Sequence, residues 1–176
     1  SARQVQSERP FRAIVAIDYN FAVSSLRKLF FSDGIREIPE SNKYSNADLD
    51  GSTGGPITLT VASNHENIRN TVAVGSRGSK VRVTFENNEK GTALLKTLTI
   101  NIPALAGLNV DCPGGFIESR GGGHIICERD YGSKRVKSGN KDATHATVLL
   151  TFDQGKEQVA TIDAKATYDY RLKKAK

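Results

Sequence analysis

Residues Gln158 to Tyr170 read QVATIDAKATYDY, and this stretch decides the fold class. Apolar and aromatic residues occupy every second position, while threonines and charged residues fill the positions between them. An alternation with a period of two predicts a β-strand with one buried face. At about 3.3 Å per residue the strand would be about 40 Å long, well beyond the usual five or six residues. We therefore expect part of it to pair outside one ordinary sheet.

A second stretch of the same character lies near the start of the chain, where Ala13 to Phe21 read AIVAIDYNF. We expect a strand over 12–23, because β-branched and aromatic residues favour strands. Residues 24–31, SSLRKLFF, fit either a short helix or a further strand. The better core face of the 12–23 strand consists of alternate residues: Val15, Ile17, Tyr19 and Phe21.

Shorter alternating segments follow at intervals of about ten residues, with turn signals between them. They are 57–62, 72–74, 81–86, 94–102, 108–112, 124–128 and 148–152. In the fourth segment the expected core face is Leu94, Lys96, Leu98, Ile100 and Ile102. Residues 87–91, NNEKG, are expected to form a turn, and no segment predicts a helix of normal length. Such a pattern is typical of an all-β antiparallel sandwich.

The organisation of the chain follows from these segments. Residues 1–32 are interpreted as a leader followed by an extension strand, 33–56 as a long polar loop, and 57–176 as the sandwich. Within the loop, Asp48, Asp50 and Ser52 invite a calcium-site interpretation, but the spacing lacks the later acidic ligands of an EF-hand, so an acidic turn is favoured. Residues 131–142 are expected to form a basic polar loop.

Charge is in moderate excess over the whole chain of 176 residues, with 25 Lys and Arg against 19 Asp and Glu, a net charge of +6. A diffuse basic surface is favoured over a specific nucleic-acid site, because basic residues are not interleaved with aromatic residues as in a single-strand groove. One local concentration is a candidate polyanion-binding set: Arg129, Lys134, Arg135, Lys137 and Lys141. No apolar run is long enough to span a membrane. The absence of methionine predicts a processed or excised chain.

Cys112 and Cys127 are the only cysteines of the sequence. A disulfide that closes the intervening loop is favoured, and it would place the protein outside a reducing cytosol. Two free buried thiols remain an alternative. A zinc cluster with His124 and His145 is a third interpretation, weakened because only one ligand pair has knuckle-like spacing.

No constellation of residues indicates catalysis. Asp18 and Asp169 occupy similar places in the two long strands, but exposed strand acids are far more common than paired acid and base groups. Gly121 to Gly123 precede a strand and not a helix, so a phosphate loop is not indicated. The sequence predicts a non-enzymatic protein without a cofactor or a metal site.

The stretch from Gly78 to Ile102, GSKVRVTFENNEKGTALLKTLTINI, resembles the middle of immunoglobulin-like or adhesion-related β-sandwich modules in secreted prokaryotic proteins. The terminal strand with Tyr168 to Tyr170 is similar to the last strand of such modules in archaeal surface proteins. The resemblance covers residues 56–172. It implies an immunoglobulin-like or jelly-roll-like sandwich and an extracytoplasmic setting, and it implies no catalytic residues.

Two functional hypotheses follow. The first is a structural subunit of a surface layer or pilus-like fibre, a homopolymer in which β-strand complementation connects subunits. Its interface residues would be Ile14, Val15, Ile17, Tyr19 and Phe21. The second is a module that binds carbohydrate or another polyanion through the loops at 129–141 and 33–56.

Overall fold

The structure, a computed structural model, describes residues 14–31, 55–63, 73–74, 78–139, 142–153 and 158–175. All regular elements among these residues are β-strands, and their bounds define the chain order. The strands are β1 Ile14–Phe31, β2 Ile57–Ser63, β3 Ala73–Val74, β4 Ser79–Asn87, β5 Thr92–Pro103, β6 Leu108–Asp111, β7 Ile117–Gly121, β8 His124–Lys137, β9 Thr144–Phe152 and β10 Gln158–Ala175.

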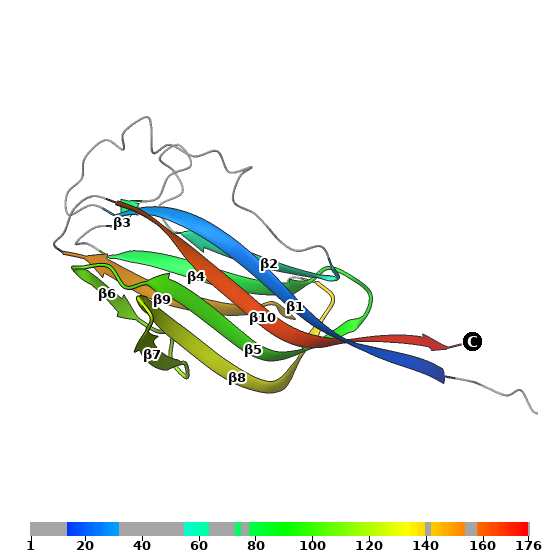
Figure 1. Cartoon of the computed structure of the whole chain (residues 1–176). Coiled ribbons are helices and arrows are strands. Elements are labelled where there is room, and N and C mark those ends of the chain that lie inside the picture. The colour runs from blue at the N-terminus through cyan, green and yellow to red at the C-terminus, as the bar shows by residue number, and fades with distance from the viewer. Residues whose placement is uncertain are drawn as a thin grey trace, which may run out of the picture.

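The strands form two sheets that pack face to face (Figure 1). The larger sheet has the order β3-β1-β10-β5-β8-β7, and the smaller has the order β2-β4-β9-β6. All pairings between neighbours are antiparallel except the short β1–β3 pairing, which is parallel. The predicted all-β antiparallel sandwich is therefore confirmed.

Strand β10 lies inside the larger sheet between β1 and β5. Its whole length pairs with β1, from Ile14 opposite Ala175 to Phe31 opposite Gln158. Its pairing with β5 covers only Asp163–Arg171. The N-terminal strand thus completes its own chain's sheet, and residues 24–31 are part of that strand and not a helix. Past Arg171, β10 pairs with β1 alone, so the two strands leave the sandwich together as a ribbon (Figure 1, right).

The core lies between the sheets and follows the predicted alternation in most strands. Aromatic side chains join the layers, since Phe31 of β1 packs edge-on against Phe152 of β9, and Tyr168 of β10 packs against Phe85 of β4, with ring centroids 5.8 and 5.5 Å apart. Such tilted pairs are favoured by the ring quadrupoles. The confirmed buried positions are Ile57, Leu59, Val61, Val81, Val83, Phe85, Val148, Leu150, Phe152, Ile162, Ala164, Ala166, Tyr168 and Tyr170.

Strand β5 departs from the predicted face. Leu95 is buried and Leu94 is not, whereas Leu98 and the alternate residues after it are buried as expected. The cause is a β-bulge at Lys96, where the register shifts against both β10 and β8. An extra residue in a strand changes the face of all residues on one side of it. The prediction that Leu94 and Lys96 share the core face was therefore wrong.

Strand β8 is longer than the sequence predicted. It continues from the expected segment through Lys137, so the interpretation of 131–142 as a basic loop was wrong for its first half. Its first residue follows a tight hairpin turn at Gly122 and Gly123, whose φ angles of 58° and 77° lie in the left-handed region. Two successive positive φ angles are what a two-residue hairpin turn of type I′ requires, and glycine adopts them without strain.

The predicted turn at 87–91 connects β4 and β5. The buried side chain of Asn87 fixes it, because Nδ2 donates hydrogen bonds to the carbonyl oxygens of Gly91 and Val136 at 3.0 and 3.2 Å. Its Oδ1 accepts the amide hydrogen of Glu89 at 3.1 Å. A buried amide with its hydrogen-bonding capacity used in this way holds the turn against β8.

Candidate interaction surfaces

The ribbon of β1 and β10 carries an apolar face that continues the core outward. Phe21 lies opposite Tyr168, Tyr19 opposite Tyr170, and Ile17 opposite Leu172. Directly opposed residues of an antiparallel pair share a face. The exposed fraction is 2% for Tyr168, but 45% for Tyr19, 44% for Ile17 and 45% for Leu172. The core-side face of the ribbon therefore becomes exposed towards its tip.

Aromatic rings connect this exposed face to the core. The ring centroid of Phe21 lies 5.9 Å from that of Tyr19 and 5.6 Å from that of Tyr168. Burial raises the pKa of the Tyr168 hydroxyl, and the neighbouring Tyr170 raises it further. Burial also raises the pKa of Tyr170, although the hydrogen bond from the Gly91 amide opposes that change.

The opposite face of the ribbon is polar and internally paired. Nε and Nη2 of Arg171 lie 2.7 and 2.9 Å from the two carboxylate oxygens of Asp18. This hydrogen bonding, together with the charge of Asp18, holds the pKa of Arg171 above its usual value. Asp169 accepts a hydrogen bond from Asn20 at 3.2 Å and pairs with Lys96 at 2.8 Å. Asp18 and Asp169 are thus each paired with a cation or an amide on an exposed face. This does not favour a role of the two carboxylates as a catalytic acid and base.

Of the residues predicted as the subunit-interface strand, Ile17, Tyr19 and Phe21 lie on the apolar ribbon face. Ile14 and Val15 lie in β1 by their backbones, but their side chains are outside the described residues. The predicted calcium-like positions Asp48, Asp50 and Ser52 are also outside the described residues.

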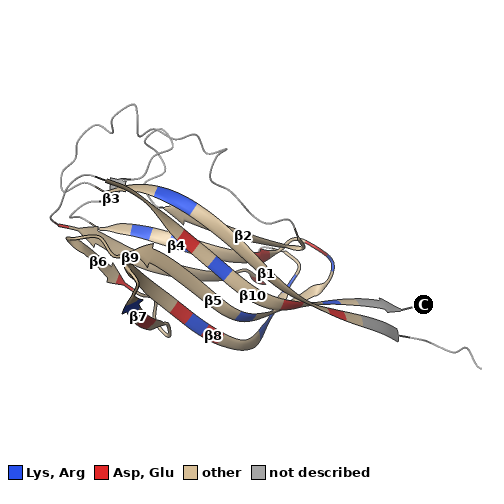
Figure 2. Ribbon diagram, in the orientation of Figure 1, with Lys and Arg blue, Asp and Glu red and all other residues tan. Residues whose placement is uncertain are grey.

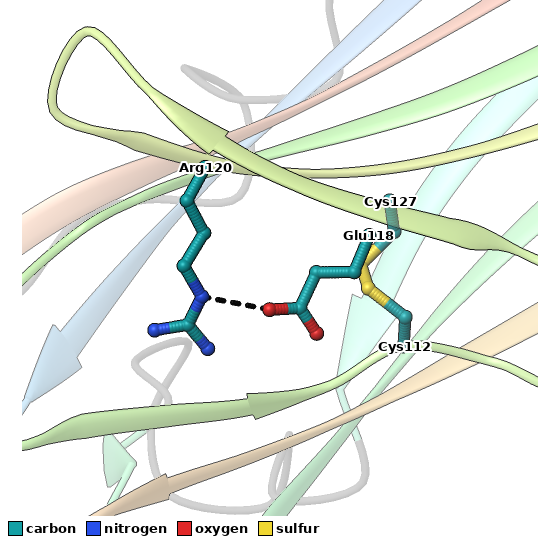
Figure 3. The surroundings of a disulfide bond; sticks show 4 residues. All are labelled: Cys112, Glu118, Arg120 and Cys127. Carbon is teal, nitrogen blue, oxygen red and sulfur yellow. Dashed lines mark hydrogen bonds and ion pairs between the residues drawn. A yellow bond between two sulfur atoms is a disulfide. The ribbon is translucent and has the colours of Figure 1, made fainter.

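Cys112 and Cys127 form the predicted disulfide, with Cα atoms 5.7 Å apart (Figure 3). Cys112 follows β6 of the smaller sheet, and Cys127 lies in β8 of the larger sheet, so the bond cross-links the two layers. A disulfide indicates an oxidising, extracytoplasmic setting. Because both sulfur atoms are used, the zinc interpretation loses its two cysteine ligands. Glu118 and Arg120 of β7 pair nearby at 2.7 Å.

The structure divides the predicted polyanion-binding set between two faces of β8. Arg129 and Lys134 lie opposite Leu98 and Leu95 of β5, which are buried, so both cations are on the core side of the strand. Arg135 and Lys137 lie opposite Leu94 and Thr92, on the other face. Lys141 is outside the described residues. Elsewhere, charged residues are scattered along the strands (Figure 2).

Tyr131 is the residue that sequence reasoning missed on the core side of β8. The guanidinium carbon of Arg129 lies 4.7 Å from the centroid of its ring, and Nζ of Lys134 lies 5.6 Å from it. Phe116 packs edge-on against the same ring at 6.4 Å. Burial raises the pKa of Tyr131, against the opposing effect of Arg129. Tyr131 stands between the two cations in the sequence, and this was the available signal.

No family model matches the chain, and no curated protein matches it. Among the described residues, no helix is long and apolar enough to cross a membrane. The same part of the chain contains no group of three or more His, Cys, Asp or Glu side chains that could hold a metal ion.

Proposed function

We propose that the protein is a non-enzymatic structural subunit of the cell exterior that associates with further copies of itself through the β1–β10 ribbon. One observation carries this proposal: the ribbon projects beyond the sandwich while one of its faces stays apolar. Ile17, Tyr19 and Leu172 expose nearly half of their surface there. The disulfide supports the extracytoplasmic part of the proposal.

The ribbon favours contact with another chain for an energetic reason. Burying a large apolar side chain contributes about 1.5–3 kcal/mol. The polar groups on the opposite face are already paired with each other, as in Asp18 with Arg171 and Asp169 with Lys96. Contact through the apolar face would therefore leave these ion pairs in water. Contact with a different surface of the next copy would produce an open fibre, whereas a self-complementary contact would close as a dimer.

Strand complementation between subunits is one form that this contact could take. In the chain itself β1 pairs with β10, so an exchanged β1 would make the same ladder with the β10 of a neighbour. Association by exchange would add no strand to a sheet and would leave Ile17 and Leu172 as exposed as they are in the single chain. Association through the ribbon face would bury both side chains. Accessibility of these two positions in the assembled form therefore distinguishes the two geometries.

The test compares two double variants, each of which replaces one isoleucine and one leucine by serine. Ile17→Ser with Leu172→Ser alters the ribbon face, and Ile117→Ser with Leu149→Ser is the matched control on exposed residues of β7 and β9. Sedimentation velocity from micromolar to millimolar protein measures association, and electron microscopy separates fibres or layers from discrete dimers. We expect the ribbon variant to weaken association by at least about tenfold and the control to have little effect. A wild-type protein that stays monomeric throughout, or equal effects of both variants, would overturn the proposal.

A further inference from the structure

The backbone of β8 is irregular where it passes the bulge of β5. Three residues of β8, Tyr131 to Ser133, stand opposite the single residue Lys96. Ser133 has a φ of 72° and is the only residue other than glycine with a positive φ among the described residues. The amide of Gly132 donates a hydrogen bond to the Asp130 carboxylate at 2.8 Å, which holds this irregular segment. Bulges of this kind redirect side chains, and strained residues collect at sites of function.

The irregular segment brings two cations onto one aromatic ring. Arg129 and Lys134 are an odd number of positions apart, so in a regular strand they would point to opposite faces. The bulge cancels that difference and places both on the core side, where they approach Tyr131. The ring attracts both cations through its quadrupole, which offsets part of the repulsion between them.

The guanidinium group of Arg129 is held in place by the turn before β7. Its Nη1 donates to the carbonyl oxygen of Gly114 at 3.4 Å. A Cβ atom at Gly115 would lie only 3.2 Å from the guanidinium, so the glycine permits this close packing. The turn is closed by a hydrogen bond from Phe116 to Pro113 at 3.0 Å, and the adjacent Cys112 ties it to β8 through the disulfide. A fixed guanidinium loses little entropy when it binds a ligand.

The two cations differ from other basic residues of the described strands in their pairing. Within the described parts of the chain, Arg129 and Lys134 form no ion pair, whereas Arg120, Arg171 and Lys96 do. The nearest acids in sequence are engaged elsewhere, because Glu128 accepts a hydrogen bond from Thr99 on the outer face and Asp130 accepts the Gly132 amide. Two cations without an ion pair among the described residues, one of them held in place by the turn before β7, therefore share one aromatic ring.

We propose that Arg129, Lys134 and Tyr131 form a binding site for the carboxylate or sulfate groups of an acidic polysaccharide. A guanidinium fork binds planar oxyanions in bidentate fashion, and an ammonium adds a second charge-assisted hydrogen bond. The site is compact and not an extended basic track, and its aromatic ring is covered by cations instead of open for base stacking, which disfavours a nucleic acid. The proposal is independent of self-association, since the site lies on β8 and the ribbon on β1 and β10.

The test uses variants of equal charge on the two faces of the same strand. Arg129→Gln with Lys134→Gln removes the site, and Arg135→Gln with Lys137→Gln is the matched control. Binding to polygalacturonate, dextran sulfate, neutral dextran and a thymidine oligonucleotide is measured by affinity electrophoresis or calorimetry at two salt concentrations. We expect the site variant to lose at least about tenfold in affinity for the acidic polysaccharides and the control less than about threefold. The first two polymers separate carboxylate from sulfate recognition.

Several outcomes would overturn the site. Equal losses in both variants would mean diffuse attraction of polyanions, and tighter binding of the oligonucleotide than of either acidic polysaccharide would mean a nucleic-acid surface. No binding of either acidic polymer would end the proposal as well. Because Arg129 packs on Gly115, its substitution could lower stability, so the single variant Lys134→Gln, at an exposed position, is tested alongside. A loss of affinity with an unchanged melting temperature in this variant would support the site, and unchanged affinity would count against it.

Discussion

The hydroxyl oxygen of Tyr170 lies 2.8 Å from the amide nitrogen of Gly91, and it accepts the hydrogen bond that this amide donates. The contact joins β10 to the turn between β4 and β5, at the position where the ribbon leaves the sandwich. Gly91 has no side chain, and this lets the ring approach: a Cβ atom there would lie 2.5 Å from the ring of Tyr170.

Substitution of Gly91 by alanine should therefore destabilise the protein. The buried ring of Tyr170 would have to move, and we expect a loss of about 1–3 kcal/mol in the free energy of unfolding, measured by urea denaturation. Tyr170→Phe should cost about 1 kcal/mol through the lost hydrogen bond. Tyr170→Leu is measured alone and in combination with Gly91→Ala, and the costs of these two single changes should not add in the combination, since the smaller side chain leaves room for the methyl group. Strict additivity would contradict the close contact.

Removal of the disulfide should lower stability more than any single surface change. The bond closes a loop with a sequence separation of 15 residues, and the loop-entropy model gives about 3 kcal/mol for such a loop. We expect the Cys112→Ser, Cys127→Ser double variant to show this loss in urea denaturation. The reduced wild-type protein should match the double variant, and a wild-type protein unaffected by reductant would contradict the prediction.

Glycine at position 133 should stabilise the protein. Ser133 has a φ of 72°, which costs a residue with a side chain more than it costs glycine. We expect Ser133→Gly to raise the free energy of unfolding by about 0.5–1 kcal/mol. Ser119→Gly in the exposed strand β7 is the control, and it should lower stability, because glycine in an extended strand costs conformational entropy. A loss of stability in both variants would refute the assignment of strain to Ser133.

Alkaline pH should weaken the fold through Tyr168 and Tyr170, whose pKa values are both raised by burial. Unfolded tyrosines ionise near pH 10, so the folded state holds these protons more tightly than the unfolded state does. Their contribution to stability is fully present below about pH 10 and decreases as the pH rises towards the folded-state pKa values. Urea denaturation at pH 9 and at about pH 10.5 measures the decrease.

The double variant Tyr168→Phe, Tyr170→Phe should show a smaller decrease between the two pH values than the wild type. Tyr19→Phe, at a ring that is 45% exposed, is the control. If the double variant lost as much stability as the wild type, the two buried hydroxyls would not be the cause.

The sequence was sufficient for the fold class and for most buried positions, because side-chain alternation in β2, β4, β9 and β10 reports directly which face is buried. It failed at Lys96 and at Tyr131 to Ser133, where extra residues change the register. A bulge is a property of two paired backbones, so it cannot be predicted from the side-chain alternation of one strand. The composition around Gly132 resembled a loop, although the strand continues.

The two candidate surfaces were only partly accessible to sequence reasoning. Ile17 and Tyr19 were placed correctly on the core side of their strand, but their exposure depends on how far the ribbon extends beyond the sandwich. The sequence shows Tyr131 between Arg129 and Lys134, but the contact of Phe116 with the Tyr131 ring depends on the turn that follows Cys112. Distances of this kind depend on pairing between segments that are far apart in the chain.

The pairing of Ile14 with Ala175 at the tip of the ribbon has a mechanical consequence. The hydrogen bonds of an antiparallel ladder run perpendicular to the strands. A pulling force applied between these two residues would therefore load the ladder one pair at a time, from the tip towards Phe31 and Gln158. Such unzipping requires less force than sliding the strands past each other. In a copy that is pulled by its β1 end and its β10 end, the ribbon would therefore open first. The disulfide-linked sandwich would unfold only at a higher force.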